Sequence, residues 1–214
     1  DGFAFCYKIP DGKGPRVNVQ SELTAYNFAG DYTAWFYNGE NHNIGPEKLT
    51  ETDGTRLPVM TVKAGDKHYM AIHEACLETG APLVLQSKGG ESLFSVASKP
   101  ASLSPGYTSA WRVVMYGVTL GVLTDSHLLE LLNPDPDPRY DFSWVKPGLA
   151  VWDWRINGAV WDGFTYGMSY PSWVRMVDFA AEQGFKYLVL DANWYGPEFE
   201  SDSDPVEGEK SQDG

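Results

Sequence analysis

Two short apolar segments in the last third of the chain constrain its fold most. Leu149–Trp154 (LAVWDW) and Tyr187–Tyr195 (YLVLDANWY) each run from apolar residues into aromatic residues and an aspartate. Between them lies a segment with helical periodicity. A right-handed crossover helix makes two such strands parallel neighbours. The pattern therefore predicts a strand-helix-strand unit, the repeating unit of a (β/α)8 barrel.

The segment between these strands carries start and stop signals of a helix. Pro171 suits the first turn, where a missing N–H costs nothing, and Gly184 suits the end. Tyr187–Leu190 is continuously apolar, which is typical of a strand covered on both faces. A helical stripe that faces a core is predicted from the spacing of Trp173, Met176, Val177, Ala180 and Ala181.

Residues 1 to about 135 show a different pattern, with short strand-like runs between Gly- and Pro-rich turns. This spacing predicts an antiparallel β-sandwich. Ser126–Leu132 predicts either a helical turn or a last strand, and the prolines of Asn133–Pro138 (NPDPDP) end both. We therefore expect domains at 1–138 and 139–214. The expected strands are Phe3–Ile9, Val17–Tyr26, Thr33–Tyr37, Leu57–Val62, Tyr69–Glu74, Pro82–Gln86, Ser92–Val96 and Ala110–Tyr116.

The charge and composition exclude several partners. A formal net charge of −13 disfavours nucleic acid and anionic membranes, which are themselves polyanions. No apolar run approaches the roughly 18 residues needed to span a bilayer. The acidic tail after Tyr195 predicts a solvated end, with a calcium-binding loop as the alternative. Cys6 and Cys76 predict free thiols, with a disulfide as the alternative.

Six segments in order along the chain resemble bacterial glycoside hydrolase family 97, whose members are α-glucosidases and α-galactosidases. They are Asp1–Pro10 (DGFAFCYKIP), Tyr69–Leu77 (YMAIHEACL), Ser109–Gly117 (SAWRVVMYG), Leu131–Asp135 (LLNPD), Ser143–Trp154 (SWVKPGLAVWDW) and Val177–Tyr195 (VDFAAEQGFKYLVLDANWY). The resemblance implies a fragment: part of an N-terminal β-supersandwich, then the first strand-helix-strand unit of a catalytic barrel. The family's general acid and its base or nucleophile come from later barrel strands. We therefore assign no catalytic residue and expect this chain alone to be inactive.

The strand ends are where the resemblance implies contact with an oligosaccharide substrate. Aromatic rings can stack on a pyranose, and carboxylates can bind its hydroxyl groups. The candidate substrate-binding residues are Trp152, Asp153, Trp154, Asp191, Trp194 and Tyr195. Two alternatives stay open: the aspartates could cap the strand-to-loop turns, and either Trp152 or Trp154 could be a core residue.

The resemblance also implies a catalytic calcium ion, with one ligand from the sandwich. The loop Asn38–Leu49 after the aromatic strand Thr33–Tyr37 offers Glu47 first and Glu40 second. A solvated loop carboxylate is the alternative for each. Calcium takes six to eight oxygen ligands, so one glutamate cannot hold it without ligands from the barrel.

The sequence thus predicts a mainly β protein, an antiparallel sandwich followed by an incomplete barrel start, from an enzyme that cleaves α-glucosidic or α-galactosidic bonds. The alternative function is a non-catalytic carbohydrate-binding or scaffold module. The family implies a periplasmic or secreted bacterial location. Open strand edges in the barrel start predict self-association.

Overall fold

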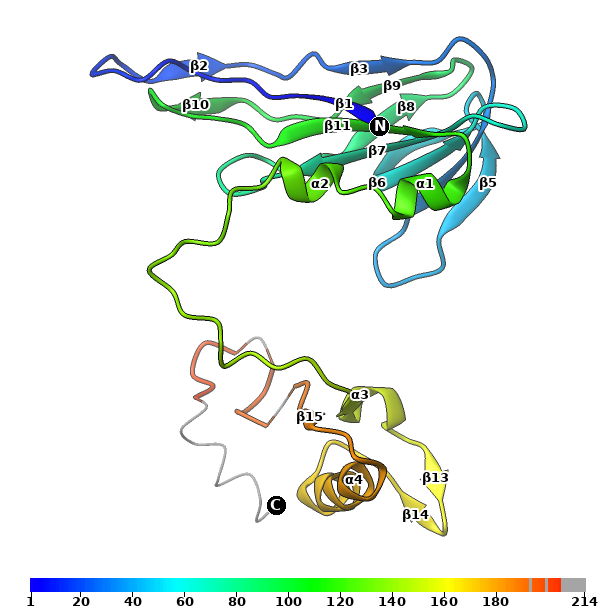
Figure 1. Cartoon of the computed structure of the whole chain (residues 1–214), viewed down its shortest axis with the longest axis vertical. Coiled ribbons are helices and arrows are strands. Elements are labelled where there is room, and N and C mark those ends of the chain that lie inside the picture. Colours follow the sequence, from blue (N-terminus) through cyan, green and yellow to red (C-terminus); the bar gives the residue numbers. More distant parts are fainter. Residues whose placement is uncertain (193, 199, 205–214) are drawn as a thin grey trace. The chain divides into compact units, whose positions relative to one another are not determined.

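The computed structural model describes residues 1–192, 194–198 and 200–204, so the end of the acidic tail lies outside the described residues. The chain divides into two compact units, Asp1–Pro136 and Asp137–Gly214. Figure 1 shows that strands dominate the first unit, whereas the second contains the longest helix.

Antiparallel strands build the first unit. Among the described residues, nine strands form one large sheet in the order β1-β11-β7-β6-β8-β9-β3, with β4 pairing with β6 and β5 pairing with β4. Its strands are β1 (Gly2–Phe5), β3 (Ala25–Asn27), β4 (Thr33–Tyr37), β5 (Ile44–Lys48), β6 (Asp53–Lys63), β7 (Tyr69–Ala75), β8 (Leu85–Lys88), β9 (Leu93–Val96) and β11 (Trp111–Gly117). The predicted mainly β, antiparallel character of this region is confirmed.

Strand β6 makes the sheet curl. Its first part, Asp53–Arg56, pairs with β8, whereas Met60–Lys63 pairs with β7. The register against β4 shifts between Thr61 and Leu57, a β-bulge that bends the strand. One strand therefore belongs to both halves of the sheet, and buried side chains of the two halves pack against each other.

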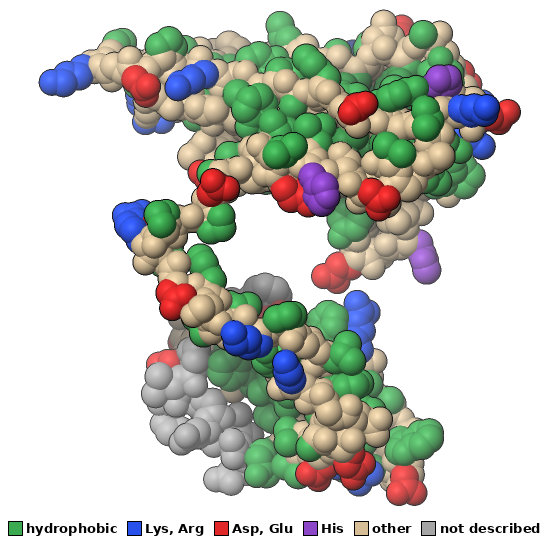
Figure 2. All heavy atoms as spheres, viewed as in Figure 1, with side chains coloured by type: hydrophobic (Ala, Val, Ile, Leu, Met, Phe, Trp, Pro, Cys, Tyr) green, Lys and Arg blue, Asp and Glu red, His purple; other side chains and the backbone are tan. Residues whose placement is uncertain are grey.

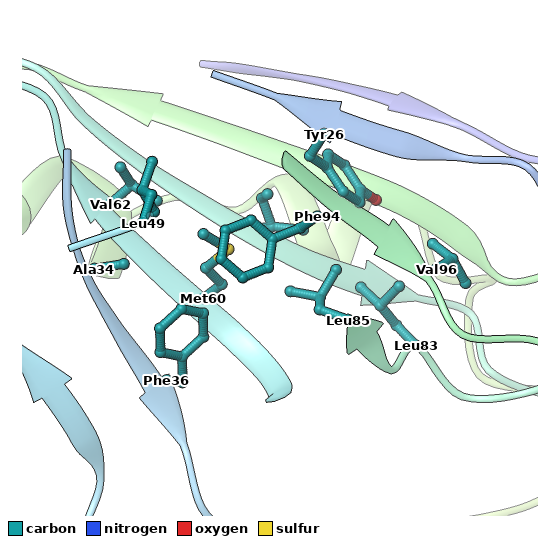
Figure 3. Close-up of a cluster of buried hydrophobic side chains, with 11 residues drawn as sticks. Tyr26, Ala34, Phe36, Leu49, Met60, Val62, Leu83, Leu85, Phe94 and Val96 are labelled. Carbon is teal, nitrogen blue, oxygen red and sulfur yellow. The ribbon is translucent and has the colours of Figure 1, made fainter. Parts of the chain in front are cut away.

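The core of the first unit fills the space inside this curl (Figure 3). Phe36 from β4 and Phe94 from β9 lie with ring centroids 5.7 Å apart. Met60 from β6 and Leu85 from β8 are fully buried around them. Because these side chains come from both halves of the sheet, their packing holds the halves together.

Several elements of the first unit differ from the prediction. The expected single strand Val17–Tyr26 is two strands: β2 (Val17–Val19) pairs with β10 (Ala101–Leu103) in a separate ribbon, and β3 pairs with β9. Figure 2 shows Lys and Arg side chains along this ribbon. Strands β5 and β10 were not predicted, because β5 contains Gly45 and Pro46 and β10 is only three residues long.

Short helices follow β11. They are α1 (Leu120–Thr124) and α2 (Leu128–Leu131), so the helical alternative for Ser126–Leu132 is the one observed. Leu123, Leu128 and Leu129 pack against a second cluster of buried residues formed by β7 and β11. The helices thereby cover one face of the sheet (Figure 1).

The second unit contains the predicted parallel pair. Strands β12 (Ala150–Trp152) and β15 (Tyr187–Val189) are parallel, with Val151 opposite Leu188. Between them lie α3 (Asp153–Ile156), the hairpin of β13 (Val160–Trp161) and β14 (Phe164–Thr165), and α4 (Tyr170–Gln183). Gly184 ends α4 with φ of 71°, a left-handed conformation that favours glycine.

Burial in this unit is lower than predicted. On α4, Met176 and Ala180 are buried, but Val177 is 51% exposed. On β15, Val189 is 43% exposed, so the expectation that this strand is covered on both faces is wrong for the described residues. Two parallel strands and one helix do not provide enough partners to cover both faces of the pair.

Candidate functional site at the ends of the parallel strands

Asp153 lies at the carboxyl end of β12, as the first residue of α3, and is fully buried. Its Oδ1 accepts a hydrogen bond from the backbone N–H of Asp191 at 3.0 Å, and its Oδ2 accepts one from the indole Nε1 of Trp173 at 2.9 Å. The carboxylate therefore joins the end of β12, the segment after β15 and helix α4. These are the bonds of a residue that caps the strand-to-loop turn.

Asp191 lies two residues beyond β15 and, unlike Asp153, is exposed. Its Oδ2 accepts a hydrogen bond from the indole Nε1 of Trp152 at 2.7 Å. The guanidinium of Arg155 lies 4.8 Å from the ring centroid of Trp152, a cation–π contact that occupies one ring face. The structure therefore brings Asp153, Asp191 and Trp152 together.

The other predicted aromatic residues are accessible. Trp154 lies on α3 and is 50% exposed, whereas it was expected to continue the strand. Trp194 and Tyr195 are half-buried and contact each other edge to face, with ring centroids 5.2 Å apart. Trp152 is also half-buried, so neither Trp152 nor Trp154 is a fully buried core residue.

Sequence reasoning missed two residues of this cluster, Trp173 and Arg155. Trp173 was predicted only as part of the apolar stripe of α4, yet its indole N–H binds Asp153. The sequence could have indicated a polar partner for Trp173, because a tryptophan that faces the core needs an acceptor for its indole N–H. Arg155 lies within α3, which has only four residues and is too short for a periodicity argument to place it.

The proposed calcium ligands lie in the first unit. The expectation that Glu47 sits in a loop is wrong: it belongs to β5, an edge strand paired with β4. Its Oε2 accepts hydrogen bonds from Arg56 at 3.3 Å and from the Thr52 hydroxyl at 3.2 Å. Glu40 is an exposed residue in the turn after β4. Among the described residues, no three His, Cys, Asp or Glu side chains form a group able to hold a metal ion.

A buried cluster of charged residues in the first unit is held together by several hydrogen bonds. Arg112 on β11 is 2% exposed and binds Glu22 with two hydrogen bonds, from Nε at 2.9 Å and from Nη2 at 2.7 Å. Its Nη1 lies 3.4 Å from Glu74 Oε2, which also accepts the backbone N–H of Leu83 at 2.7 Å. Burial by itself would raise the pKa of Glu22, but hydrogen bonds from Arg112 and Thr24 outweigh it and hold that pKa below its ordinary value.

Two further predictions concern the state of the cysteines and the presence of membrane-spanning segments. Both cysteines, Cys6 and Cys76, are free, so the disulfide alternative is not observed. Within the described part of the chain, no helix has the length and apolar character needed to span a membrane.

Comparison with known proteins identifies the class of protein. Residues 1–134 match the model of the glycosyl-hydrolase 97 N-terminal family. The chain belongs to this family, which confirms the resemblance seen in the sequence.

Individual relatives agree with this assignment. The chain is 27% identical to a retaining α-galactosidase of Bacteroides thetaiotaomicron and 30% identical to a probable retaining α-galactosidase of Streptomyces bingchenggensis, with 91% of this chain covered in each case. A family 97 enzyme of Pseudoalteromonas, solved in complex with acarbose, shares the fold with a TM-score of 0.72 and 24% identity over 98% of this chain.

The chain spans only part of these proteins. It covers 35% and 30% of the two curated relatives and 36% of the Pseudoalteromonas chain. It therefore corresponds to about a third of a family 97 protein, and the match with the family model lies in its N-terminal region.

Proposed function

We propose that this chain is the N-terminal part of an α-glycosidase that cleaves α-glucosidic or α-galactosidic bonds of oligosaccharides. In this proposal Asp1–Pro136 is the β-supersandwich domain, and the unit after it begins a catalytic (β/α)8 barrel. The catalytic carboxylates would come from later barrel strands, so the present residues bind and orient the sugar.

One observation carries the proposal: the parallel strands β12 and β15 end side by side in two aspartates and a group of aromatic residues. In α/β barrels the active site forms from the loops at this end of the strands. Asp191 is exposed there and Trp154 is half exposed, so a carboxylate and an aromatic ring are available to a ligand. The names of the relatives, which include α-galactosidases and an acarbose complex, supply the chemical class.

The described residues do not by themselves fit a calcium ion. Glu47 is already ion-paired with Arg56, and no other carboxylate joins it in a group of three potential ligands within the described ranges. Calcium needs six to eight oxygens. We therefore propose calcium only for the complete enzyme.

A second candidate function is favoured by one feature of the first unit. Phe3, Phe5 and Tyr7 form a row on the edge strand β1 and the residues after it, with successive ring centroids 5.8 and 5.7 Å apart. Phe3 is 63% exposed and Tyr7 48% exposed. An exposed row of rings could bind a sugar chain in a non-catalytic module.

Reading the gene beyond the codon for Gly214 and expressing the complete product tests the main proposal. We expect the reading frame to continue for about 150 or more residues, as a barrel of typical length requires. We also expect hydrolysis of p-nitrophenyl α-glucoside or α-galactoside that EDTA reduces. A stop codon after Gly214, combined with sugar binding that is lost in Phe3→Ala and kept in Trp154→Ala, would instead establish the binding module.

A periplasmic or secreted location is part of the proposal and is supported by the family alone. Fractionation of the bacterial cell, with immunodetection of the complete product, tests it. A product confined to the cytoplasmic fraction would contradict it.

A further inference from the structure

Asp153 and Asp191 both follow the ends of neighbouring strands, but their environments differ. Asp153 is 0% exposed, and both of its carboxylate oxygens accept hydrogen bonds from other parts of the unit. Because the carboxylate is fully buried, a ligand could reach it only if the surrounding residues moved. Asp191 is exposed and can meet a ligand directly.

The hydrogen bonds around the two aspartates form a closed circuit. Asp191 donates its backbone N–H to Asp153, and the side chain of Asp191 accepts the indole N–H of Trp152, the residue directly before Asp153. Each strand end therefore holds the other. Trp173 adds a third connection, from the first turns of α4 to Asp153.

We propose that Asp153 is a positioning residue, which fixes the Asp191 carboxylate and the Trp152 ring for a sugar without touching the sugar itself. Its role as part of a sugar site rests on the proposed function above. The fixing of Asp191 and Trp152 rests on the geometry alone. Hydrogen bonds to a charged acceptor are the strong ones, so two of them on one buried carboxylate hold the strand ends firmly.

The circuit predicts an asymmetry between two otherwise similar substitutions. In Asp153→Asn the side chain keeps its shape but offers one neutral acceptor oxygen to two N–H donors, so one bond is lost and the other is weakened. Because Asp191 then moves, the indole N–H of Trp152 should also lose protection, although it does not bind Asp153. In Asp191→Asn only the bond to Trp152 is weakened, and the indole of Trp173 should stay protected.

Hydrogen exchange of the indole protons in the ¹⁵N-labelled full chain measures this asymmetry by NMR. We expect Asp153→Asn to speed exchange of both the Trp152 and the Trp173 indole protons at least tenfold, and Asp191→Asn to speed only that of Trp152. Asp178→Asn, an exposed aspartate on α4, is the matched control and should change neither. The half-exposed Trp154 serves as a reference in every variant.

Trp173→Phe covers the case in which Asp153→Asn does not fold. It removes one donor from Asp153, 20 residues away along the chain from that aspartate, and should also speed exchange at Trp152. If the Trp152 indole exchanges at the wild-type rate in whichever of these two variants folds, Asp153 does not position it and the proposal is overturned.

Titration with maltose and melibiose separates this proposal from the proposed function. We expect Asp153→Asn to weaken the binding of the sugar that the wild type binds at least tenfold, with Asp178→Asn unchanged. If the wild-type chain binds neither sugar while the exchange asymmetry is observed, the sugar site fails and the positioning of Asp191 by Asp153 stands. Equal sugar affinity in Asp153→Asn and wild type would overturn the positioning role at that site.

Discussion

Replacing Arg112 with methionine should destabilise the first unit strongly. The substitution keeps an apolar stem but removes the guanidinium that lies between Glu22 and Glu74. The side chains of these glutamates are only 15% and 12% exposed. Two carboxylates would then remain largely buried without a cation.

The size of the expected loss in stability follows from the burial of the Arg112–Glu22 ion pair. Removing one partner of a buried ion pair costs about 3–5 kcal/mol, because the remaining charge is left uncompensated. Glu22 retains some access to water, so we expect a loss of about 3 kcal/mol in the free energy of unfolding at neutral pH. Adding Glu22→Gln to the variant removes one of the two charges and should recover about 1–2 kcal/mol.

The loss should depend on pH with a defined sign. Because the folded pKa of Glu22 lies below its ordinary value of 4.5, the stabilisation is present above that pH and is lost as the pH falls through the folded pKa. Without Arg112, burial dominates and raises the pKa of Glu22, so protonation relieves the variant. The difference in stability between wild type and Arg112→Met should therefore narrow below pH 4.5.

Urea unfolding of the full chain, followed by circular dichroism, measures these differences. Lys8→Met is a matched control, because its ion pair with Asp11 spans 4.0 Å between exposed side chains and should not affect the urea midpoint. An Arg112→Met variant with the wild-type midpoint at neutral pH would refute the reasoning. A stability difference between wild type and Arg112→Met that is as large below pH 4.5 as at neutral pH would also refute it.

Four further predictions test other parts of the structure. The Tyr26 hydroxyl is buried without a partner among the described residues, and burial raises its pKa to about 12. Tyr26→Phe should leave the free energy of unfolding in urea unchanged or raise it by up to about 1 kcal/mol. The wild type should lose stability as the pH rises from 10 towards 12, and the variant should lose less. Phe94→Ala should cost about 3–5 kcal/mol in urea unfolding, through the cavity left between the halves of the sheet. Gly184→Ala should cost about 1 kcal/mol in a thermal melt, because alanine disfavours the positive φ that ends α4. The exposed side chains of Tyr187 and Val189 should make the chain associate as its concentration rises, and a concentration-independent monomer in size-exclusion chromatography would contradict this.

Local signals predicted some elements well. The helix that begins near Pro171 and ends at Gly184 is observed as α4, and the aromatic strand Thr33–Tyr37 is observed with the same bounds. In both cases the pattern lies within one element. The exposure of Val177 could not be predicted in this way, because the burial of a helical residue depends on what packs against the helix.

The sequence did not show which strands of the first unit pair with each other. β5 was missed because its strand character comes from its pairing with β4, not from its own residues. Arg112 binds Glu22, which is 90 residues away in the sequence, so no local pattern connects the two residues. Likewise, the sequence placed Asp153 and Asp191 at one sheet edge, and only the geometry distinguished the buried acceptor from the exposed carboxylate.

The pairing of β1 with β11 has a consequence for biosynthesis. Gly2 lies opposite Met115, so one of the first residues described here must wait for a strand made more than a hundred residues later. Translation proceeds at about 5–20 residues per second, so β1 stays unpaired for several seconds or longer while β11 is made. During that interval the rings of Phe3 and Phe5 are open to chaperones and to neighbouring nascent chains.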